Sequence, residues 1–187
     1  MRSTRCHSCA GTVRLQRPRS YPYRESGLTN VVLLGGVEIE VCTKCSERTV
    51  TVTREEQLLQ VLALSLLRKP LGSLGGAEMR YLRKVCGLTQ QGLANMLHVR
   101  RATVADRERG RSTLAAEGEF VFRAVVLETF SQRMREKGVS HLDRHHRQEL
   151  KDLRAGFPRL PLQESRRPRK ATRIPRTDGS WRIPRAA

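Results

Sequence analysis

At 187 residues the chain has room for one or two small domains, and hydrophobic (38%) and aromatic (4%) contents are low for one large core. These values favour two small modules followed by a tail. The formal net charge is +18, and residues 131–187 carry more than half of the surplus, with 16 basic and 6 acidic side chains. A surplus of this size indicates a polyanionic partner, for which nucleic acid is the usual choice.

The longest apolar stretch, Leu58 to Leu67, covers about ten residues, too few to cross a bilayer. The first eleven residues contain cysteines and polar side chains where a secretion signal needs an apolar run. We therefore expect a cytoplasmic protein. Cysteines stay reduced in the cytosol, so paired cysteines there indicate metal ligands rather than disulfides.

Residues 1–53 are predicted to form a small β-rich module. Gly35-Gly36 lies between two of the expected strands and predicts a tight hairpin turn. The expected strands, identified by β-branched or alternating residues, are Thr12–Gln16, Val31–Leu34, Val37–Val41 and Thr49–Thr53.

This module contains two CxxC pairs, Cys6/Cys9 and Cys42/Cys45. A two-residue gap turns both thiolates toward one ion, and four thiolates close a tetrahedral zinc site with no open position. We therefore predict one structural zinc ion per chain. The alternative, a pair of redox motifs, would normally follow a strand in a βαβ setting, which is absent. His7 is interpreted as a bystander and Cys86 as a small core residue.

A connecting helix and linker are expected over residues 54–76. Thr53 and Glu56 fit a capping box before the helix, and Pro70 closes the segment. The helix has almost no polar face and must therefore be buried. It either packs on the zinc module or forms a dimer interface.

Residues 77–136 are predicted to form a helix-turn-helix domain. A first helix ends before Gly87, Thr89 caps a second helix that runs to Leu97, and a basic third helix runs from about Arg101 to Arg109, with Gly110 after it. A short helix, a tight turn and a basic last helix match the geometry that places a recognition helix in the major groove.

Two parts of the sequence resemble known families. The helical part resembles Xre-type (Cro-like) repressors, and the front module resembles the YgiT-type zinc finger. Joined in this order over residues 6–130, they resemble MqsA-family antitoxins, which implies a homodimer on a palindromic operator, autoregulation, and often a cognate toxin bound through the zinc module. The residues that carry these resemblances are Leu88–Ala94, Val99, Thr103, Val104, Glu108–Gly110, Ser26–Val31, Gly36-Val37 and Cys42–Cys45.

The third helix departs from the family pattern, so its DNA contacts are assigned from chemistry. Arg101 can bond guanine O6 and N7, and Ala102 can meet a thymine methyl group. Asp106 can accept only from cytosine N4, or it pairs with Arg109 one turn on. The expected phosphate contacts are Arg100, Arg107, Arg109, Arg111, Gln90 and Thr103. The departures are Arg100, Ala102, Asp106 and Arg107.

Residues 137–187 are predicted to be a basic, largely disordered tail, with a weakly amphipathic helix over Ser140–Arg154. The motif Arg-Ile-Pro-Arg occurs at 173–176 and again at 182–185. Such a segment can follow a phosphate backbone, and Trp181 can stack on a base or fill a protein pocket. The alternative is a terminus that only aids solubility.

These observations predict an α+β protein: a four-cysteine zinc module, an all-α helix-turn-helix domain and a disordered basic tail. The predicted function is sequence-specific binding of double-stranded DNA, as an antitoxin that represses its own operon and acts as a homodimer. The alternatives are a stand-alone zinc-containing regulator without a toxin and, less favoured, an RNA-binding protein. No enzymatic activity is expected, because His141, His145 and His146 lie in a polar segment without a carboxylate pocket.

Overall fold

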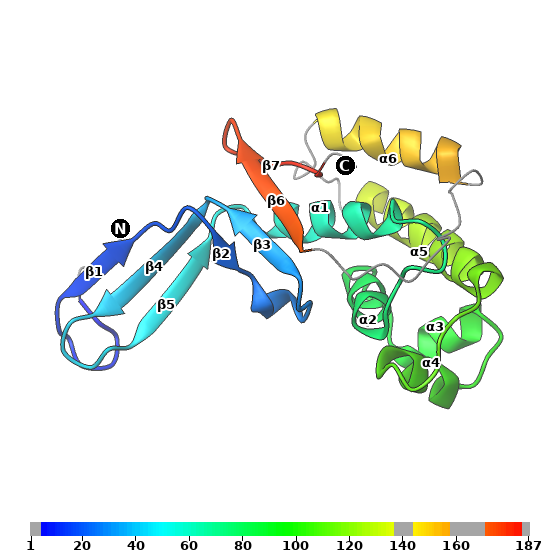
Figure 1. The fold of residues 1–187 in the computed structure, drawn as a ribbon, viewed down its shortest axis with the longest axis horizontal. Coiled ribbons are helices and arrows are strands. Elements are labelled where there is room, and N and C mark those ends of the chain that lie inside the picture. The colour runs from blue at the N-terminus through cyan, green and yellow to red at the C-terminus, as the bar shows by residue number, and fades with distance from the viewer. Residues whose placement is uncertain (1–4, 137–143, 158–170, 185–187) are drawn as a thin grey trace.

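The computed structural model describes residues 5–136, 144–157 and 171–184. It shows a mixed α+β fold, as predicted, in which a β-rich arm projects from a helical body (Figure 1). The strands are β1 (Val13–Gln16), β2 (Tyr21–Pro22), β3 (Val31–Leu34), β4 (Val37–Cys42), β5 (Arg48–Val52), β6 (Thr172–Thr177) and β7 (Ser180–Trp181). The α-helices are α1 (Glu55–Leu67), α2 (Gly76–Val85), α3 (Gln90–Met96), α4 (Arg101–Glu108), α5 (Ala116–Glu136) and α6 (Arg144–Gly156).

The described strands form two sheets, β1-β4-β5 and β2-β3-β6-β7. The predicted hairpin at Gly35-Gly36 is wrong, because β3 and β4 belong to different sheets. Both glycines have positive φ (82° and 70°), so the chain does reverse sharply there. The reversal carries it from one sheet into the other, since β4 pairs with β1 and β5 on its two sides. The alternation of apolar and polar residues along a strand indicates which face of the strand is buried, but it does not indicate which other strand pairs with it.

The predicted buried helix is confirmed as α1, whose side chains at Leu58, Leu62 and Leu67 are fully buried inside the chain. The expected capping box is absent. The N-cap is Arg54, in the left-handed region with φ of 53° and without a side-chain cap. Thr53 instead continues the β structure, because its N–H donates to the Gly36 carbonyl (3.0 Å).

The end of α1 is held by a residue of α5. Arg123 is fully buried, and its guanidinium donates to the carbonyls of Leu67 (3.1 Å), Lys69 and Pro70 (2.9 Å). Glu119, one turn earlier on α5, forms an ion pair with it. The Leu67 carbonyl is among the groups that a helix leaves unsatisfied at its C-terminus, and Lys69 and Pro70 lie just after that helix, so the ion pair fastens α5 to the end of α1.

The predicted helix-turn-helix elements are present as α2, α3 and α4. Thr89 caps α3 as expected, its hydroxyl accepting from the Gly92 N–H (2.9 Å). His98, with φ of 50°, forms the turn into α4, and Gly110, with φ of 75°, follows that helix. Leu93 and Ala94 of α3 are buried.

The prediction of a disordered tail is wrong for residues 171–184, which form β6 and β7. Arginine and proline account for five of the fourteen residues of this segment, but Ile174, Trp181 and Ile183 are all buried. Their burial provides the apolar contacts that composition alone did not reveal. The predicted amphipathic helix is present as α6, and residues 137–143 and 158–170 lie outside the described part.

Among the described helices, none is both long and apolar enough to cross a membrane.

Candidate metal centre and nucleic-acid interface

The four predicted ligands come together at the end of the arm. Cys6 and Cys9 precede β1, Cys42 ends β4, and Cys45 follows in the turn toward β5. Each CxxC loop closes with a backbone hydrogen bond four residues on, from Ala10 N–H to the Cys6 carbonyl (2.9 Å) and from Ser46 N–H to the Cys42 carbonyl (3.1 Å). Both closing residues have positive φ (54° and 59°), so the two loops have the same local form.

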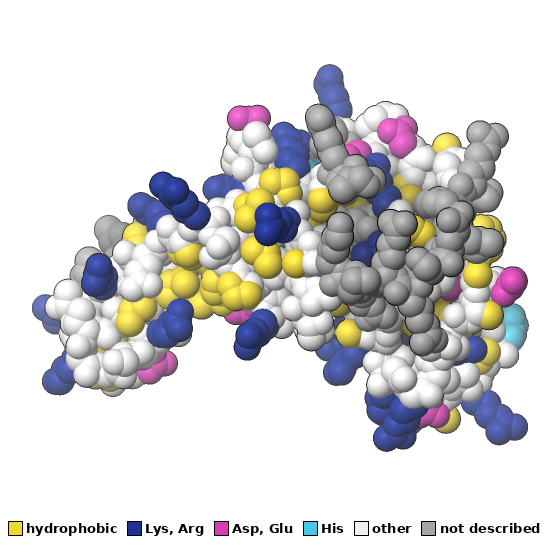
Figure 2. Space-filling model, in the orientation of Figure 1, with side chains coloured by type: hydrophobic (Ala, Val, Ile, Leu, Met, Phe, Trp, Pro, Cys, Tyr) yellow, Lys and Arg dark blue, Asp and Glu magenta, His cyan; other side chains and the backbone are white. Residues whose placement is uncertain are grey.

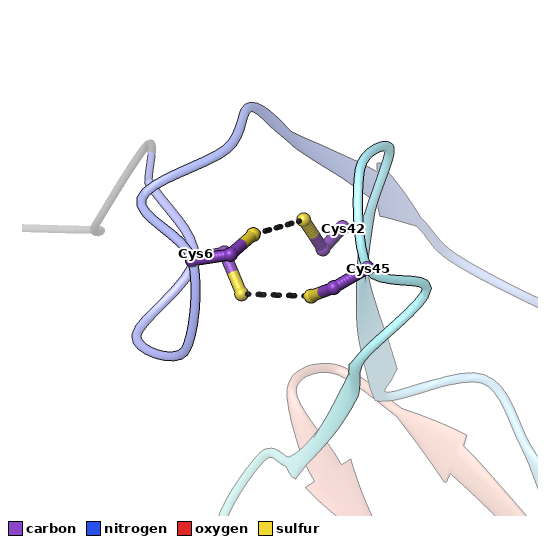
Figure 3. Close-up of side chains that lie close together, drawn as sticks. Cys6, Cys42 and Cys45 are labelled. Carbon is purple, nitrogen blue, oxygen red and sulfur yellow. Dashed lines mark hydrogen bonds between the residues drawn. The ribbon is translucent and has the colours of Figure 1, made fainter.

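The sulfur atoms form a compact cluster that could hold one metal ion (Figure 3). All four Sγ atoms lie within 4.8 Å of one another, with Cys6–Cys45 at 3.6 Å and Cys9–Cys42 at 3.4 Å. A tetrahedral ion bound about 2.3 Å from each sulfur requires sulfurs about 3.8 Å apart. The cysteines are free thiols, so the cluster is a set of ligands and not a pair of disulfides.

The thiols in the cluster have sharply different acidities. Backbone N–H groups of Cys45 and Lys44 lower the pKa of Cys42 to about 6. The Glu47 N–H favours the thiolate of Cys45, but hydrogen bonds with the neighbouring thiols Cys9 and Cys42 outweigh it and raise the pKa of Cys45 to about 12. Such a cluster cannot hold four thiolates near neutral pH on its own, whereas a bound cation stabilises all of them.

Gly11 contributes to the cluster without being a ligand. A Cβ at this position would lie 2.9 Å from the Lys44 Cβ, 3.1 Å from the Cys42 Sγ and 3.2 Å from the Cys9 Sγ. Only a residue without a side chain leaves room for the two loops to close on each other. The sequence shows a glycine here, but nothing in the CxxC spacing identifies its role.

The two other residues considered from the sequence, His7 and Cys86, are not members of the cluster. His7 is exposed, and among the described residues the group that could hold a metal ion consists of the four cysteines alone. Cys86 is buried and donates to the Val126 carbonyl (3.5 Å), with a pKa that burial raises to about 12. It is therefore a core residue, as interpreted from its spacing.

The predicted recognition helix, α4, has one buried face and one exposed face. Val104, Ala105 and Glu108 are buried toward α2 and α3. Arg100, Arg101 and Ala102 are exposed, and Thr103 is half-buried beside them. Figure 2 shows Lys and Arg side chains gathered at the end of the body that contains α3 and α4.

A buried ion pair anchors α4 to α2. Arg83 Nε lies 2.5 Å from Glu108 Oε1, and Arg83 Nη2 lies 3.0 Å from Oε2. A third donation runs from Arg83 Nη1 to the Leu88 carbonyl (2.6 Å), in the turn before α3. Gln90 donates its amide to Glu108 (2.9 Å), so this predicted phosphate contact also has a partner inside the fold.

Asp106 lies in an exposed cluster with two of the predicted phosphate contacts. Its carboxylate is 2.9 Å from Arg109 Nη1 and 3.6 Å from Arg111 Nη1. This is the pairing considered as the alternative to cytosine recognition. Arg107 is half-buried on the same helix.

The first turn of α4 has an uncompensated positive charge. Arg100 is the N-cap without a side-chain cap, Arg101 follows, and no acidic residue lies in that turn. Cations at a helix N-terminus oppose the helix dipole, whereas a phosphate group there is stabilised by both the dipole and the arginines.

No family model, characterised protein or solved structure was found to match the chain. The family resemblance stated from the motifs therefore stays a prediction.

Proposed function

We propose that the protein is a transcription regulator that binds a specific sequence of double-stranded DNA through α4, with a structural zinc ion in its arm. The main support is the arrangement of α4: its inner face is fixed by the Arg83–Glu108 pair, and its N-cap and first two residues are exposed and include two arginines. A rigidly anchored helix with arginines at its free end has the geometry of a major-groove reader.

Zinc is proposed because four thiolates in a closed tetrahedral cluster are its usual structural ligands. A metal ion held this way has no open coordination position and catalyses nothing. Its role in this proposal is to hold the β1-β4-β5 sheet together at the end away from the core.

The proposal predicts distinct effects of two arginine substitutions. Arg101→Ala should weaken binding to the preferred sequence by about 1–3 kcal/mol and relax the preference at one position per half-site, because a bidentate contact to guanine is lost. Arg111→Ala should weaken binding to every sequence alike, since a phosphate contact carries no base information. The measurement is selection from a random duplex pool with each variant, followed by titration of the selected site.

The matched control is Arg48→Ala, which removes an exposed arginine from the arm, away from α4. It should leave both affinity and preference near the values of the unsubstituted chain. If Arg101→Ala lowers affinity without altering the selected sequence, Arg101 is a phosphate contact and not a base reader. If no duplex is selected at all, the DNA-binding proposal is wrong.

A protein partner for the arm, such as the toxin implied by the resemblance, is the second part of the proposal. The edge strand β1 has no pairing partner on its outer side among the described residues, and Leu15 on it is 37% exposed. An open edge with an exposed aliphatic side chain can accept a strand from another protein. A homodimer that leaves this edge free is compatible with both activities.

The test is co-expression of the full chain with the product of the adjacent gene. A co-purifying complex that relieves a growth defect supports the antitoxin hypothesis, and Leu15→Lys should abolish that complex. Leu34→Lys is the control, because Leu34 has the same exposed fraction but lies on β3. Without an adjacent toxic gene, the stand-alone regulator is the better proposal.

A further inference from the structure

The C-terminal segment joins the fold as an added strand. β6 pairs with β3 in parallel, with Val31 opposite Thr172 and Leu34 opposite Pro175. Figure 1 shows β6 beside β3, at the junction between the arm and the helical body. A parallel pairing of strands about 140 residues apart in sequence does not follow from chain connectivity, so the contacts between the two surfaces must provide it.

Trp181 is the anchor of this segment. Its side chain is fully buried, its indole N–H donates to the Thr53 carbonyl (2.7 Å), and its backbone N–H donates to Gln57 Oε1 (3.2 Å). Ile174 is also fully buried, on the preceding strand. The hairpin thus presents one aromatic and one aliphatic side chain to the sheet and to the start of α1.

The receiving surface has a shape that fits the indole ring. A Cβ on Gly36 would lie 2.9 Å from Trp181 Cη2 and 2.6 Å from Arg176 Cδ. Gly35 has a similar positive φ, but a Cβ there would meet nothing within 4 Å. Gly36 therefore leaves open the space that the tryptophan fills.

The hairpin also holds the joint between the arm and the body. Arg54, the residue of positive φ at which β structure changes to α1, donates to the Ser180 hydroxyl (3.1 Å). This hydrogen bond and the one from Trp181 to Thr53 hold Thr53 and Arg54, the two residues between β5 and α1, in place. Releasing the hairpin would free the joint as well as the edge of β3.

We propose that the edge of β3, Gly36 and the first turn of α1 form a strand-acceptor site for a hairpin peptide. The chain's own residues 171–184 occupy the site in cis, and the same segment of a second copy fills it once the first is released. The hairpin makes identical contacts in cis and in trans. The main free-energy cost of the exchange is therefore the loss of the high effective concentration that the tether gives to the chain's own hairpin. The acceptor site forms whether or not the protein binds DNA.

The first test uses the fact that Trp181 is the only tryptophan in the chain, so its fluorescence reports the hairpin alone. In the full chain its emission should be blue-shifted, as expected for a buried indole. Gly36→Ala should shift the emission to the red and expose residues 171–184 to protease. Gly35→Ala is the matched control, because it imposes similar backbone strain without a clash. Equal emission in the two variants would overturn the assignment of Gly36 to the site.

The second test measures binding in trans. A fluorescein-labelled peptide of residues 171–187 is titrated against the full chain carrying Trp181→Ala, and its anisotropy is followed. The peptide should bind this chain at least about tenfold more tightly than the unsubstituted chain, whose own hairpin competes at an effective concentration near millimolar. Adding Gly36→Ala to the Trp181→Ala chain should abolish binding, whereas adding Gly35→Ala should not.

Ile174→Asp is a second variant whose own hairpin should be released from the acceptor site. It replaces Trp181→Ala in the test if circular dichroism shows that Trp181→Ala does not fold. Millimolar peptide added to the unsubstituted chain gives a readout that needs no variant, because it should then compete with the tethered hairpin. Failure of the peptide to bind the folded variants, or binding that Gly36→Ala leaves unchanged, would refute the acceptor site.

Discussion

Removal of the metal ion should unfold the arm while the helical body stays folded. In the β1-β4-β5 sheet, Val37 and Ile39 are buried, but Val41, near the cysteines, and Val50 are only half-buried, so apolar contacts at the far end are few. A metal ion bound by the four cysteines would then be the main link there. Structural zinc sites in small peptides contribute about 10–16 kcal/mol to folding. A chelator titration followed by amide hydrogen exchange should show loss of protection in β1, β4 and β5 but not in α2–α4.

The same result should follow from Cys9→Ser, with metal content falling from one ion per chain to near zero. Cys86→Ser is the control, because Cys86 is a buried cysteine outside the cluster, and this variant should retain the ion. Gly11→Ala should also lower metal content, since its Cβ would collide with the loops that carry the ligands. Full occupancy in Cys9→Ser, or an arm that stays protected after chelation, would contradict the assignment.

Features that depend on short stretches of chain were predictable. The spacing within Cys6/Cys9 and Cys42/Cys45 predicted the four cysteines that the structure brings together, because a two-residue gap turns the two thiols of each pair toward each other. Thr89 was predicted as a cap from its position before α3, and the structure has its hydroxyl in that role. The bounds of β3 agree with the prediction, since its β-branched and apolar residues and the following glycines define that strand locally.

Features that depend on distant parts of the chain were not predictable. Trp181 needs the space at Gly36 and the carbonyl of Thr53, and nothing near residue 181 reveals either of them. Arg123 resembles a surface charge in sequence, although it closes the C-terminus of α1. The prediction that β3 pairs with β4 was wrong for the same reason. Gly35-Gly36 predicts a chain reversal, but the strands beside β3 include one from the far end of the chain.

Breaking the Arg83–Glu108 pair should lower the free energy of unfolding of the helical body by about 3–5 kcal/mol, because Glu108→Ala leaves a buried guanidinium without its counter-ion. Glu108 and Arg83 side chains are only 3% and 9% exposed, so water cannot replace the lost contact easily. Urea unfolding at neutral pH measures the change. Asp106→Ala is the control: its pairs with Arg109 and Arg111 are exposed, and the expected effect is below about 1 kcal/mol.

The same pair should make stability depend on pH in a defined direction. Burial raises the pKa of Glu108, but hydrogen bonds from Arg83 and Gln90 and the charge of Arg83 outweigh it, so the pKa lies below its ordinary value of 4.5. A carboxylate whose pKa is lowered by folding stabilises the fold above its unfolded pKa. That contribution is lost as the pH falls through the folded pKa. The free energy of unfolding should therefore decrease below about pH 4.5, and Glu108→Gln should reduce that decrease.

A double variant separates the loss of an attraction from the burial of an unpaired charge. Arg83→Met combined with Glu108→Leu removes both charges, and apolar side chains of similar size often replace a buried ion pair without loss. We expect the double variant to be more stable than Glu108→Ala. If Glu108→Ala proves no more damaging than Asp106→Ala, the pair does not anchor α4. The exposed arginines at the start of α4 would then lack the rigid support on which base recognition depends.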